Sequence, residues 1–270
     1  MLTYDHANRA SQGARPYQED SAAIWPSDDP LTAGLPAALP SDTTVLAVLA
    51  DGMGGHVGGA LASNLVCTTL LETYAKGKET VSRRLAMSLD AANQAIRRKG
   101  TANPQLMGMG ATAVGVAFCP DGAHWISVGD SPLYLFRKGE LTRVNEDHSL
   151  APLLDKLAAE GKMDPEEAKN DHRRHYLRSA VTGEEIELID ASEKPLALEA
   201  GDIVVLASDG ILTLEDEHIL KVIAASAGEP AVKIADALLG DVEAANEPHQ
   251  DNTTVVVVKI MPAGLTGPMT

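Results

Sequence analysis

The chain of 270 residues is 44% hydrophobic and 22% charged, with 15 prolines and 23 glycines. This composition is typical of a globular protein with a buried core, and it excludes the disordered, collagenous and low-complexity classes. Twenty-two lysines and arginines against 38 aspartates and glutamates give a net charge of −16, which repels nucleic acid and anionic lipid, so neither is an expected partner.

Hydrophobic patterning predicts strands and helices along most of the chain. Apolar runs of strand length, mostly β-branched and bounded by Gly, Asp or Pro, indicate buried strands. Apolar residues at three- and four-residue steps indicate helices instead. In chain order, the predicted elements are strands at 21–25 and 44–50, helices at 59–75 and 81–99, strands at 111–118, 124–129 and 132–136, a helix pair near 149–159, a strand at 202–208, a helix pair over 215–239 and a strand at 253–260.

Two tight-turn sequences indicate how these strands pair. The segments C-P-D-G at 119–122 and R-K-G-E at 137–140 are typical of turns between neighbouring antiparallel strands, so residues 111–145 are predicted to form an antiparallel meander. A doubly wound parallel sheet is therefore disfavoured. The predicted fold is α+β, a β-sandwich of two antiparallel sheets flanked by helices on both sides. The Pro-rich segment 26–41 and the charged segment 161–178 are expected to be mobile surface excursions.

Domain organisation and location follow from what the sequence lacks. No linker or repeat divides the chain, so residues 1–262 are predicted to form a single domain and 263–270 a frayed C-terminal tail. Cys67 and Cys119 stand alone in apolar runs, which indicates neither a disulfide framework nor a zinc site and favours a cytoplasmic location. No apolar stretch approaches the roughly 20 residues that span a bilayer, and the N-terminal residues do not resemble a signal peptide. Membrane insertion and export are not expected.

Acidic residues stand at the ends of the predicted strands. They are Asp51, Asp130 and Asp209 just after a strand, and Glu19, Asp20 and Asp251 just before one. Any single case is most often a turn, but five such places together exceed what turn chemistry requires. If these strand ends meet, six carboxylates gather without an interleaved His or Cys, and oxygen-only ligands select Mg²⁺ or Mn²⁺ over zinc. Because two bare carboxylates ~5 Å apart repel by about 3 kcal/mol at an effective dielectric of 20, such a cluster requires bound cations.

Seven short motifs occur in a fixed order along nearly the whole chain. They are R-P-Y-Q-E-D from residue 15, A-D-G-M-G-G-H from 50, G-A-T-A-V from 110, V-G-D-S from 128, E-D-H-S from 146, A-S-D-G from 207 and Q-D-N-T-T from 250. Together they resemble the metal-dependent serine/threonine protein phosphatases of the protein phosphatase 2C (PPM) family. The resemblance implies a β-sandwich flanked by helices, with a two-metal centre in the cleft between the sheets. It also implies an enzyme that hydrolyses phosphoserine and phosphothreonine with a metal-activated water.

The resemblance assigns the central ligands position by position. Asp51 looks like the carboxylate that bridges two Mn²⁺ or Mg²⁺ ions, and the carbonyl of Gly52 looks like a further ligand. Asp209 and Asp251 resemble direct ligands of the first metal.

The remaining assignments concern outer ligands and the substrate. Glu19 and Asp20 resemble residues that hold metal-bound waters, and Asp130 resembles the residue that completes a third, weaker metal site with Asp209. Arg15 resembles the arginine that grips the substrate phosphate, a task that suits a guanidinium group because its fork can bind two phosphate oxygens at once. Arg15, Asp51 and Asp209 are therefore the expected catalytic residues.

The chain departs from the family pattern at two positions. Pro132 replaces the arginine that usually follows V-G-D-S, and Met53 stands where many eukaryotic members carry a histidine thought to act as general acid. Met53 resembles the bacterial branch of the family. The nearby His56 is not expected to replace that histidine, because it lies beyond two glycines and next to the positive end of a predicted helix.

The charged segment N-D-H-R-R-H-Y-L-R-S resembles the variable flap beside the family's cleft. His172 and His175 are interpreted there as surface residues rather than metal ligands, and Arg173, Arg174 and Arg178 as groups that meet a phosphorylated substrate.

The expected partners are phosphorylated proteins and a serine/threonine kinase whose action the enzyme reverses. Two alternatives stay open. A catalytically inactive docking module would lack metal ligands, whereas all the acidic positions are present here. A metal-dependent hydrolase of small phosphates is not distinguished by the sequence, because substrate choice depends on surface loops.

Overall fold

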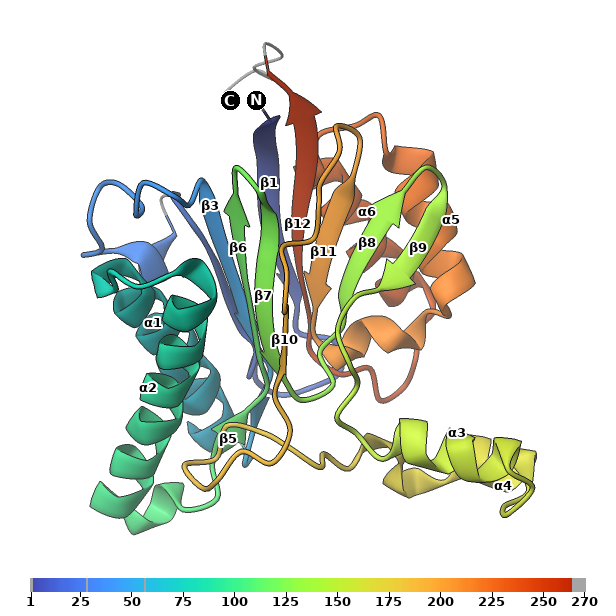
Figure 1. The fold of residues 1–270 in the computed structure, drawn as a ribbon. Coiled ribbons are helices and arrows are strands. Elements are labelled where there is room, and N and C mark those ends of the chain that lie inside the picture. Colours follow the sequence, from blue (N-terminus) through green and yellow to red (C-terminus); the bar gives the residue numbers. More distant parts are fainter. Residues whose placement is uncertain (1, 28, 56, 264–270) are drawn as a thin grey trace.

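The computed structural model describes residues 2–27, 29–55 and 57–263. His56 and nearly all of the expected C-terminal tail lie outside these ranges. Two five-stranded antiparallel sheets face each other, with helices on both outer sides (Figure 1). The predicted α+β sandwich is therefore confirmed. Among the helices of the described ranges, none combines the length and the apolar character needed to cross a membrane.

One sheet carries helices α1 (Val57–Lys76) and α2 (Val81–Ala102) on its outer face. Its strand order is β10-β7-β6-β3-β2. The strands are β2 (Ser21–Trp25), β3 (Val45–Ala50), β6 (Ala113–Cys119), β7 (Gly122–Val128) and β10 (Asp190–Ala191). A short ladder of β4 (Gly52–Met53) and β5 (Gly110–Ala111) lies at the end of this sheet.

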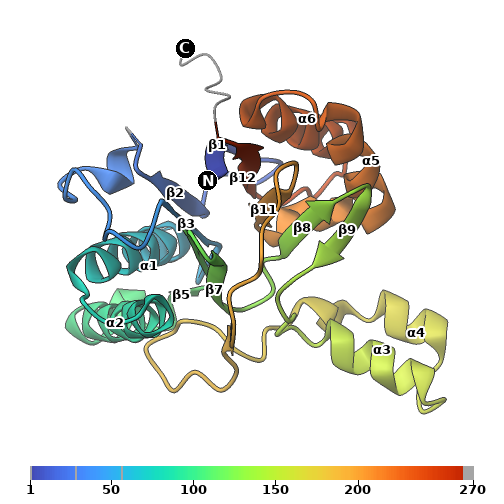
Figure 2. The same ribbon diagram turned by 45° about the horizontal axis from the view of Figure 1, so that its top comes forward.

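The second sheet carries α5 (Asp216–Ser226) and α6 (Ala231–Ala244), on the opposite side of the molecule (Figure 2). Its strand order is β1-β12-β11-β8-β9. The strands are β1 (Leu2–Ser11), β8 (Leu133–Arg137), β9 (Glu140–Arg143), β11 (Ile203–Ala207) and β12 (Thr253–Pro262). Helices α3 (Ala151–Ala159) and α4 (Pro165–Asn170) form a separate pair that projects beside one end of the sandwich (Figure 1).

Three apolar clusters hold the four layers together. Leu49, Val116 and Leu206 belong to the cluster between the sheets. Alternate residues of the same strands point outward and pack against α1 and α2 on one side and against α5 and α6 on the other. Strand β3 is buried along its whole length, because one face meets the facing sheet and the other meets the helices. This explains its continuous apolar sequence.

The predicted meander over 111–145 is wrong in one respect. Strands β6 and β7 form one hairpin and β8 and β9 another, but the chain crosses from the first sheet to the second between Val128 and Leu133. Gly129 makes this crossing possible: its φ is +103°, and a Cβ there would lie 2.6 Å from Thr112 Cγ2. The turn sequences identify the two hairpins, but they carry no information on whether neighbouring hairpins share a sheet.

The two segments expected to be surface excursions contain short ordered elements. Segment 26–41 includes a 3₁₀ turn at Pro30–Thr32. Segment 161–178 includes α4 and a 3₁₀ turn at His172–His175, and Ala168 of α4 is buried. Both cysteines are buried and free.

Candidate active site

The acidic strand ends meet at one end of the sandwich because the pairing is antiparallel. Ser21 at the start of β2 is paired with Ala50 at the end of β3, which places Glu19 and Asp20 beside Asp51. Ala207 at the end of β11 is paired with Val255 near the start of β12, the neighbouring strand of the same sheet, which places Asp209 near Asp251. Asp130 lies in the crossing from β7 to β8.

These ends surround a cavity of about 630 Å³. Seven of the eight predicted site residues line it: Arg15, Glu19, Asp51, Gly52, Asp130, Asp209 and Asp251. Asp20 does not line the cavity. It is buried behind the wall, where its Oδ2 accepts a hydrogen bond from the hydroxyl of Ser208 at 2.7 Å. Its influence on the cavity is electrostatic: its negative charge raises the pKa of Asp51, and it repels the carboxylate of Asp209.

Asp51 is fixed by hydrogen bonds to the neighbouring strand connection. Its backbone N–H donates to Thr112 Oγ1 at 2.9 Å, and the N–H of Thr112 donates to its carbonyl at 2.9 Å. The hydroxyl of Thr112 also pairs with that of Ser131 at 2.7 Å. Thr112 thus links the end of β3 to the loop that carries Asp130.

Gly52 stands where three backbone segments converge. A Cβ there would lie 2.2 Å from the carbonyl oxygen of Gly59 and 2.4 Å from that of Glu19. No side chain fits in this space, so the start of α1, Glu19 and Gly52 approach each other through their backbones.

Asn252 organises the segment that carries Arg15 and Glu19. Its Oδ1 accepts the N–H of Glu19 at 2.8 Å, and its Nδ2 donates to the carbonyls of Gln12 and Tyr17 at 2.8 and 2.9 Å. Arg15 reaches over the cavity and forms an ion pair with Asp251. Both side chains are partly exposed, at 48% and 37%, so this pair lies at the mouth of the cavity.

Burial and mutual repulsion raise the pKa values of the inner carboxyls. Burial, followed by the charge of Asp209, raises the pKa of Asp130 to about 7. Burial, with the charges of Asp209 and Asp251, raises that of Asp20 to about 6. Asp51 and Asp209 are also raised by burial and by their acidic neighbours.

The donor set fits divalent metal ions. Two buried carboxylate oxygens, Glu19 Oε1 and Asp20 Oδ1, have no hydrogen-bond partner within the described part of the chain. Unpartnered buried carboxylate oxygens and raised pKa values are what a metal site shows when its cations are absent, because bound cations would compensate the charge. The ligand atoms on offer are all oxygens, which favours Mg²⁺ or Mn²⁺.

One wall of the cavity comes from the segment beyond α4. His175, Tyr176 and Leu177 line it. His175 is exposed, as expected of a surface residue, and it lies in the segment that the sequence predicts beside the cleft. Two of the neighbouring arginines are already paired: Arg173 with Asp171 and Arg174 with Asp155, each at 2.6 Å.

The sequence reasoning gave no role to Thr112 or Asn252. Both stand inside the quoted motifs, G-A-T-A-V and Q-D-N-T-T, but a hydroxyl or an amide carries no chemical signal of its own. Their role depends on hydrogen bonds to the backbone of distant segments, which appears only in the folded chain.

Comparisons with known proteins agree with this geometry. A family model described as Protein phosphatase 2C matches residues 26–237. The serine/threonine protein phosphatase PstP of Mycobacterium tuberculosis is 34% identical over 221 residues, which are 80% of this chain and 40% of that protein. The chain therefore spans two fifths of the length of this relative. Protein phosphatase PhpP of Streptococcus pneumoniae is 32% identical over 171 residues, which are 62% of this chain and 67% of that protein.

A solved structure supports the similarity in three dimensions. The catalytic domain of PstP, determined in complex with 2 manganese ions, matches with a TM-score of 0.74 at 30% identity, over 97% of this chain and 100% of that one. The likeness therefore extends over the whole sandwich.

Proposed function

The chain belongs to the protein phosphatase 2C family, and on this premise we propose that it hydrolyses phosphoserine and phosphothreonine in proteins at a binuclear Mn²⁺ or Mg²⁺ centre. The observation that carries the proposal is the cavity in which five carboxylates converge with one arginine at its mouth. PstP, which binds two manganese ions, supports the metal requirement.

The place of each acid in the cavity indicates which cation it would hold. Asp51, whose backbone is fixed by Thr112, would hold both ions, and the carbonyl of Gly52 would be a further ligand. Asp209 and Asp251 would bind the first ion directly. When bound, the two ions supply charge compensation for the phosphoryl oxygens and lower the pKa of an attacking water.

The outer acids would complete the centre. Glu19 at the wall and Asp20 behind it would orient waters around the ions. Asp130, buried in the sheet crossing near Asp209, would contribute to a third, weaker cation site.

Arg15 would bind the substrate phosphate. In the structure its guanidinium contacts Asp251 at the cavity mouth, and this contact neutralises part of its charge. Cations on Asp251 would weaken that ion pair, which would free the guanidinium fork for two phosphate oxygens. Substrate binding and metal binding are thus coupled through one carboxylate.

Direct attack by water agrees with the composition of the cavity wall. Within the described residues, the lining includes no serine, cysteine or lysine, and its threonine hydroxyl is held by Ser131 and the Asp51 backbone. Within the described residues, the wall therefore offers no serine, cysteine or lysine as a covalent nucleophile.

The biological setting is part of the same proposal. Residues 1–262 would act as a single catalytic domain in the cytoplasm. Its partners would be phosphorylated proteins and a serine/threonine protein kinase that it opposes in signalling. The net charge of −16 argues against nucleic acid as a partner.

The test is turnover of a phosphothreonine peptide compared with nucleotides and sugar phosphates, in the presence of Mn²⁺. We expect kcat/KM for the peptide to be higher by about a hundredfold or more, which corresponds to about 2.7 kcal/mol of transition-state binding.

Asp209→Asn and Asp251→Asn are expected to lose most activity while remaining folded. Asp236→Asn, an exposed carboxylate on α6, is the matched control. Preference for small phosphates would favour a metabolite hydrolase, and no turnover by the Mn²⁺-loaded protein would favour a docking module.

A further inference from the structure

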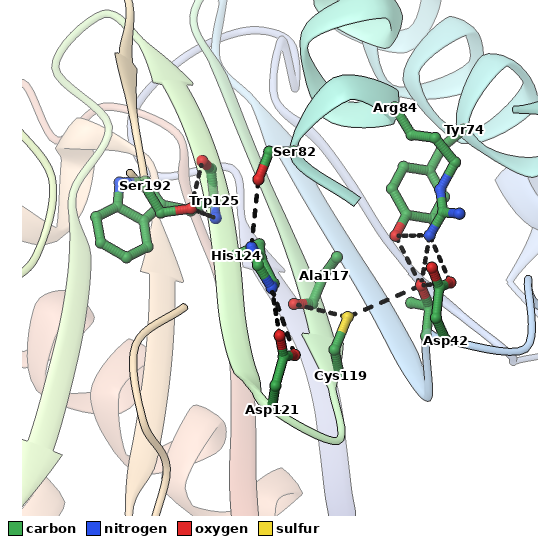
Figure 3. Close-up of polar contacts among 11 residues, drawn as sticks. Asp42, Tyr74, Ser82, Arg84, Ala117, Cys119, Asp121, His124, Trp125 and Ser192 are labelled. Carbon is green, nitrogen blue, oxygen red and sulfur yellow. Dashed lines mark hydrogen bonds and ion pairs between the residues drawn. The ribbon is translucent and has the colours of Figure 1, made fainter. Parts of the chain in front are cut away.

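A second group of metal-ligating side chains lies at the far end of the β6–β7 hairpin. Cys119 ends β6, Asp121 stands in the turn, and His124 belongs to β7 (Figure 3). The sulfur, a carboxylate oxygen and a ring nitrogen all lie within 4.8 Å of one another. Strand β6 separates this group from Thr112 and Asp51 by about 20 Å, at roughly 3.3 Å per residue. The group is therefore distinct from the acidic cavity.

The spacing between Asp121 and His124 suits metal ligands better than an ion pair. His124 Nε2 lies 3.4 Å from both carboxylate oxygens of Asp121, which is long for a hydrogen bond to a carboxylate, where about 2.7–2.9 Å is normal. Two nitrogen or oxygen ligands about 2.1 Å from one tetrahedral zinc ion lie about 3.4 Å apart. The two side chains are thus already at the separation that a shared ion requires.

The imidazole is held from its other side. Ser82, in the first turn of α2, lies with its Oγ 3.4 Å from His124 Nδ1, and the His124 side chain is only 10% exposed. A polar group at the far nitrogen fixes the ring orientation of many metal-binding histidines. With Nδ1 on the side of Ser82, Nε2 points toward Asp121, as Figure 3 shows.

Cys119 supplies the soft ligand from the neighbouring strand. Its sulfur makes long contacts, 3.9 Å to the hydroxyl of Thr43 and 3.8 Å to the carbonyl of Ala117, so little holds it in place. Burial raises the pKa of Cys119 to about 11, and a metal ion must therefore displace its proton. The charges of Asp121 and Asp42 also raise this pKa, and the cation of Arg84, bound to Thr43 and Asp42 at 3.1 and 2.6 Å, opposes them in part.

We propose that Cys119, Asp121 and His124 bind one borderline divalent transition-metal ion, of the class of Zn²⁺ or Co²⁺. A sulfur, a nitrogen and an oxygen ligand select such ions over Mg²⁺. The fourth position is left to water, since Asp121 is 62% exposed and gives the site access to solvent. The spacing C-x-D-x-x-H contains no C-x-x-C pair, which is why the sequence indicated no zinc site.

The bound ion would cross-link neighbouring elements and stabilise the fold. It would join the end of β6 to the start of β7 across the hairpin turn, and through Ser82 it would attach the hairpin to the first turn of α2. We therefore expect Zn²⁺ to raise the melting temperature of the protein even when its acidic centre is saturated with Mg²⁺.

The test is a Co²⁺ titration of the whole protein in excess Mg²⁺, followed by absorbance in the near ultraviolet. A thiolate-to-cobalt charge-transfer band reports a bound cysteine, and the acidic centre cannot produce it because its ligands are oxygens. We expect the band to reach the intensity of one thiolate-bound Co²⁺ per protein, whatever further Co²⁺ the acidic centre takes up, and to disappear when Zn²⁺ displaces Co²⁺. Absence of the band in the unmodified protein at millimolar Co²⁺ would overturn the proposal without any variant.

Variants identify the ligands. Cys119→Ser should abolish the band, whereas Cys67→Ser, which removes the other buried thiol, should leave it unchanged. Asp121→Asn and His124→Gln should weaken Co²⁺ binding by about tenfold or more. A band that is lost in Cys67→Ser, or that both Asp121→Asn and His124→Gln leave at full affinity, would contradict the assignment.

Discussion

At the scale of single residues, Arg15 and Asp251 form the ion pair that, on the proposed function, a substrate phosphate would meet. The pair lies at the mouth of the cavity and joins two partly exposed side chains, and exposed pairs of this kind are worth at most about 1 kcal/mol. The pair is therefore weak enough to open when a phosphate group or a cation competes for either partner.

This arrangement predicts the effect of changing Arg15. Arg15→Ala should raise KM for a phosphopeptide by about tenfold or more while kcat falls less, because the guanidinium mainly binds the phosphate of the ground state. Arg15→Lys should recover only part of the loss, since an ammonium group lacks the two-pronged geometry. Steady-state kinetics with saturating Mn²⁺ measures both parameters. An unchanged KM in Arg15→Ala would place this residue outside the substrate site.

Asp130 differs from the other acids because it lies in the crossing between the two sheets. Its backbone is held by Arg143, whose guanidinium donates to the Asp130 carbonyl at 2.7 Å. Pro132, which stands where the family usually has arginine, donates no such bond. Arg143 on β9 thus supplies a guanidinium close to this loop, although the sequence motif lacks one.

Replacing Asp130 should affect turnover more than the central metal pair. Asp130→Ala is expected to keep two bound Mn²⁺ ions and to lower kcat by about tenfold, because the proposed third, weaker cation site would lose a ligand. Metal content at saturating Mn²⁺ and kcat on the phosphopeptide test this together. Three fully occupied Mn²⁺ sites in a crystal of the variant would refute it.

At the scale of elements, the sequence predicts the buried strands better than the half-exposed ones. Strands β3, β6, β11 and β12 have apolar residues on both faces, so continuous apolar runs mark them. Strand β1 escaped prediction because its sequence L-T-Y-D-H-A-N-R-A-S is mostly polar and it lies at the edge of its sheet. Its pairing with β12 along its full length is a tertiary effect that local patterning does not report.

Arg174 connects the elements that form the wall beside the cavity. Its guanidinium binds both carboxylate oxygens of Asp155 on α3, at 2.6 and 3.0 Å, and the carbonyl of Ala168 on α4 at 3.1 Å. Arg173 contacts Asp171, only two residues away in its own segment. The first arginine therefore links α3, α4 and the lining residue His175, whereas the second links nothing distant.

We expect these adjacent arginines to behave differently. Arg174→Ala should loosen the wall and raise KM for a phosphopeptide by about three- to tenfold, equivalent to roughly 0.7–1.4 kcal/mol. It should leave kcat/KM for p-nitrophenyl phosphate nearly unchanged, because this small substrate has no peptide chain to extend along the wall. Arg173→Ala is the matched control and should change neither substrate. Equal losses on both substrates in Arg174→Ala would show that the wall acts on the metal centre rather than on peptide binding.

At the scale of the whole molecule, the sequence predicts which strand ends carry the acids. It does not predict how deeply each acid is buried or which residues hold it in place. Antiparallel pairing brings strand ends together at one edge, so Asp51, Asp209 and Asp251 could be grouped from their places next to apolar runs. The depth of each acid depends on the assembled layers: Asp20 is buried behind the wall while Asp251 reaches the mouth. Asn252 stands next to Asp251, but its function depends on hydrogen bonds to the backbone of Gln12, Tyr17 and Glu19. These contacts exist only in the folded chain, which explains why the sequence left Asn252 without a role.

The convergence of acids should make the metal-free protein less stable as the pH rises. Asp20 and Asp130 have pKa values of about 6 and about 7, against an ordinary value of 3.8. At a pH between the ordinary value of 3.8 and the raised value, such a carboxyl binds more protons in the folded state than in the unfolded state. The free energy of unfolding therefore falls as the pH increases through this range. Burial lowers the pKa of His6 and His148, and these two groups contribute the opposite slope below about pH 6.5.

The melting temperature of the metal-free protein should therefore drop by about 5 °C or more between about pH 4 and pH 7, at 2–4 °C per kcal/mol for a protein of this size. Saturating Mn²⁺ should remove most of this dependence, because bound cations favour the ionised carboxylates. Asp130→Asn should reduce the slope of the metal-free protein, and Asp236→Asn, an exposed control, should retain it. The Asn variant isolates the acids from the histidines, which it leaves in place. A melting temperature that is flat with pH, or a slope that Mn²⁺ leaves unchanged, would mean that the carboxylates tolerate each other without cations and that the cluster is not built around a metal pair.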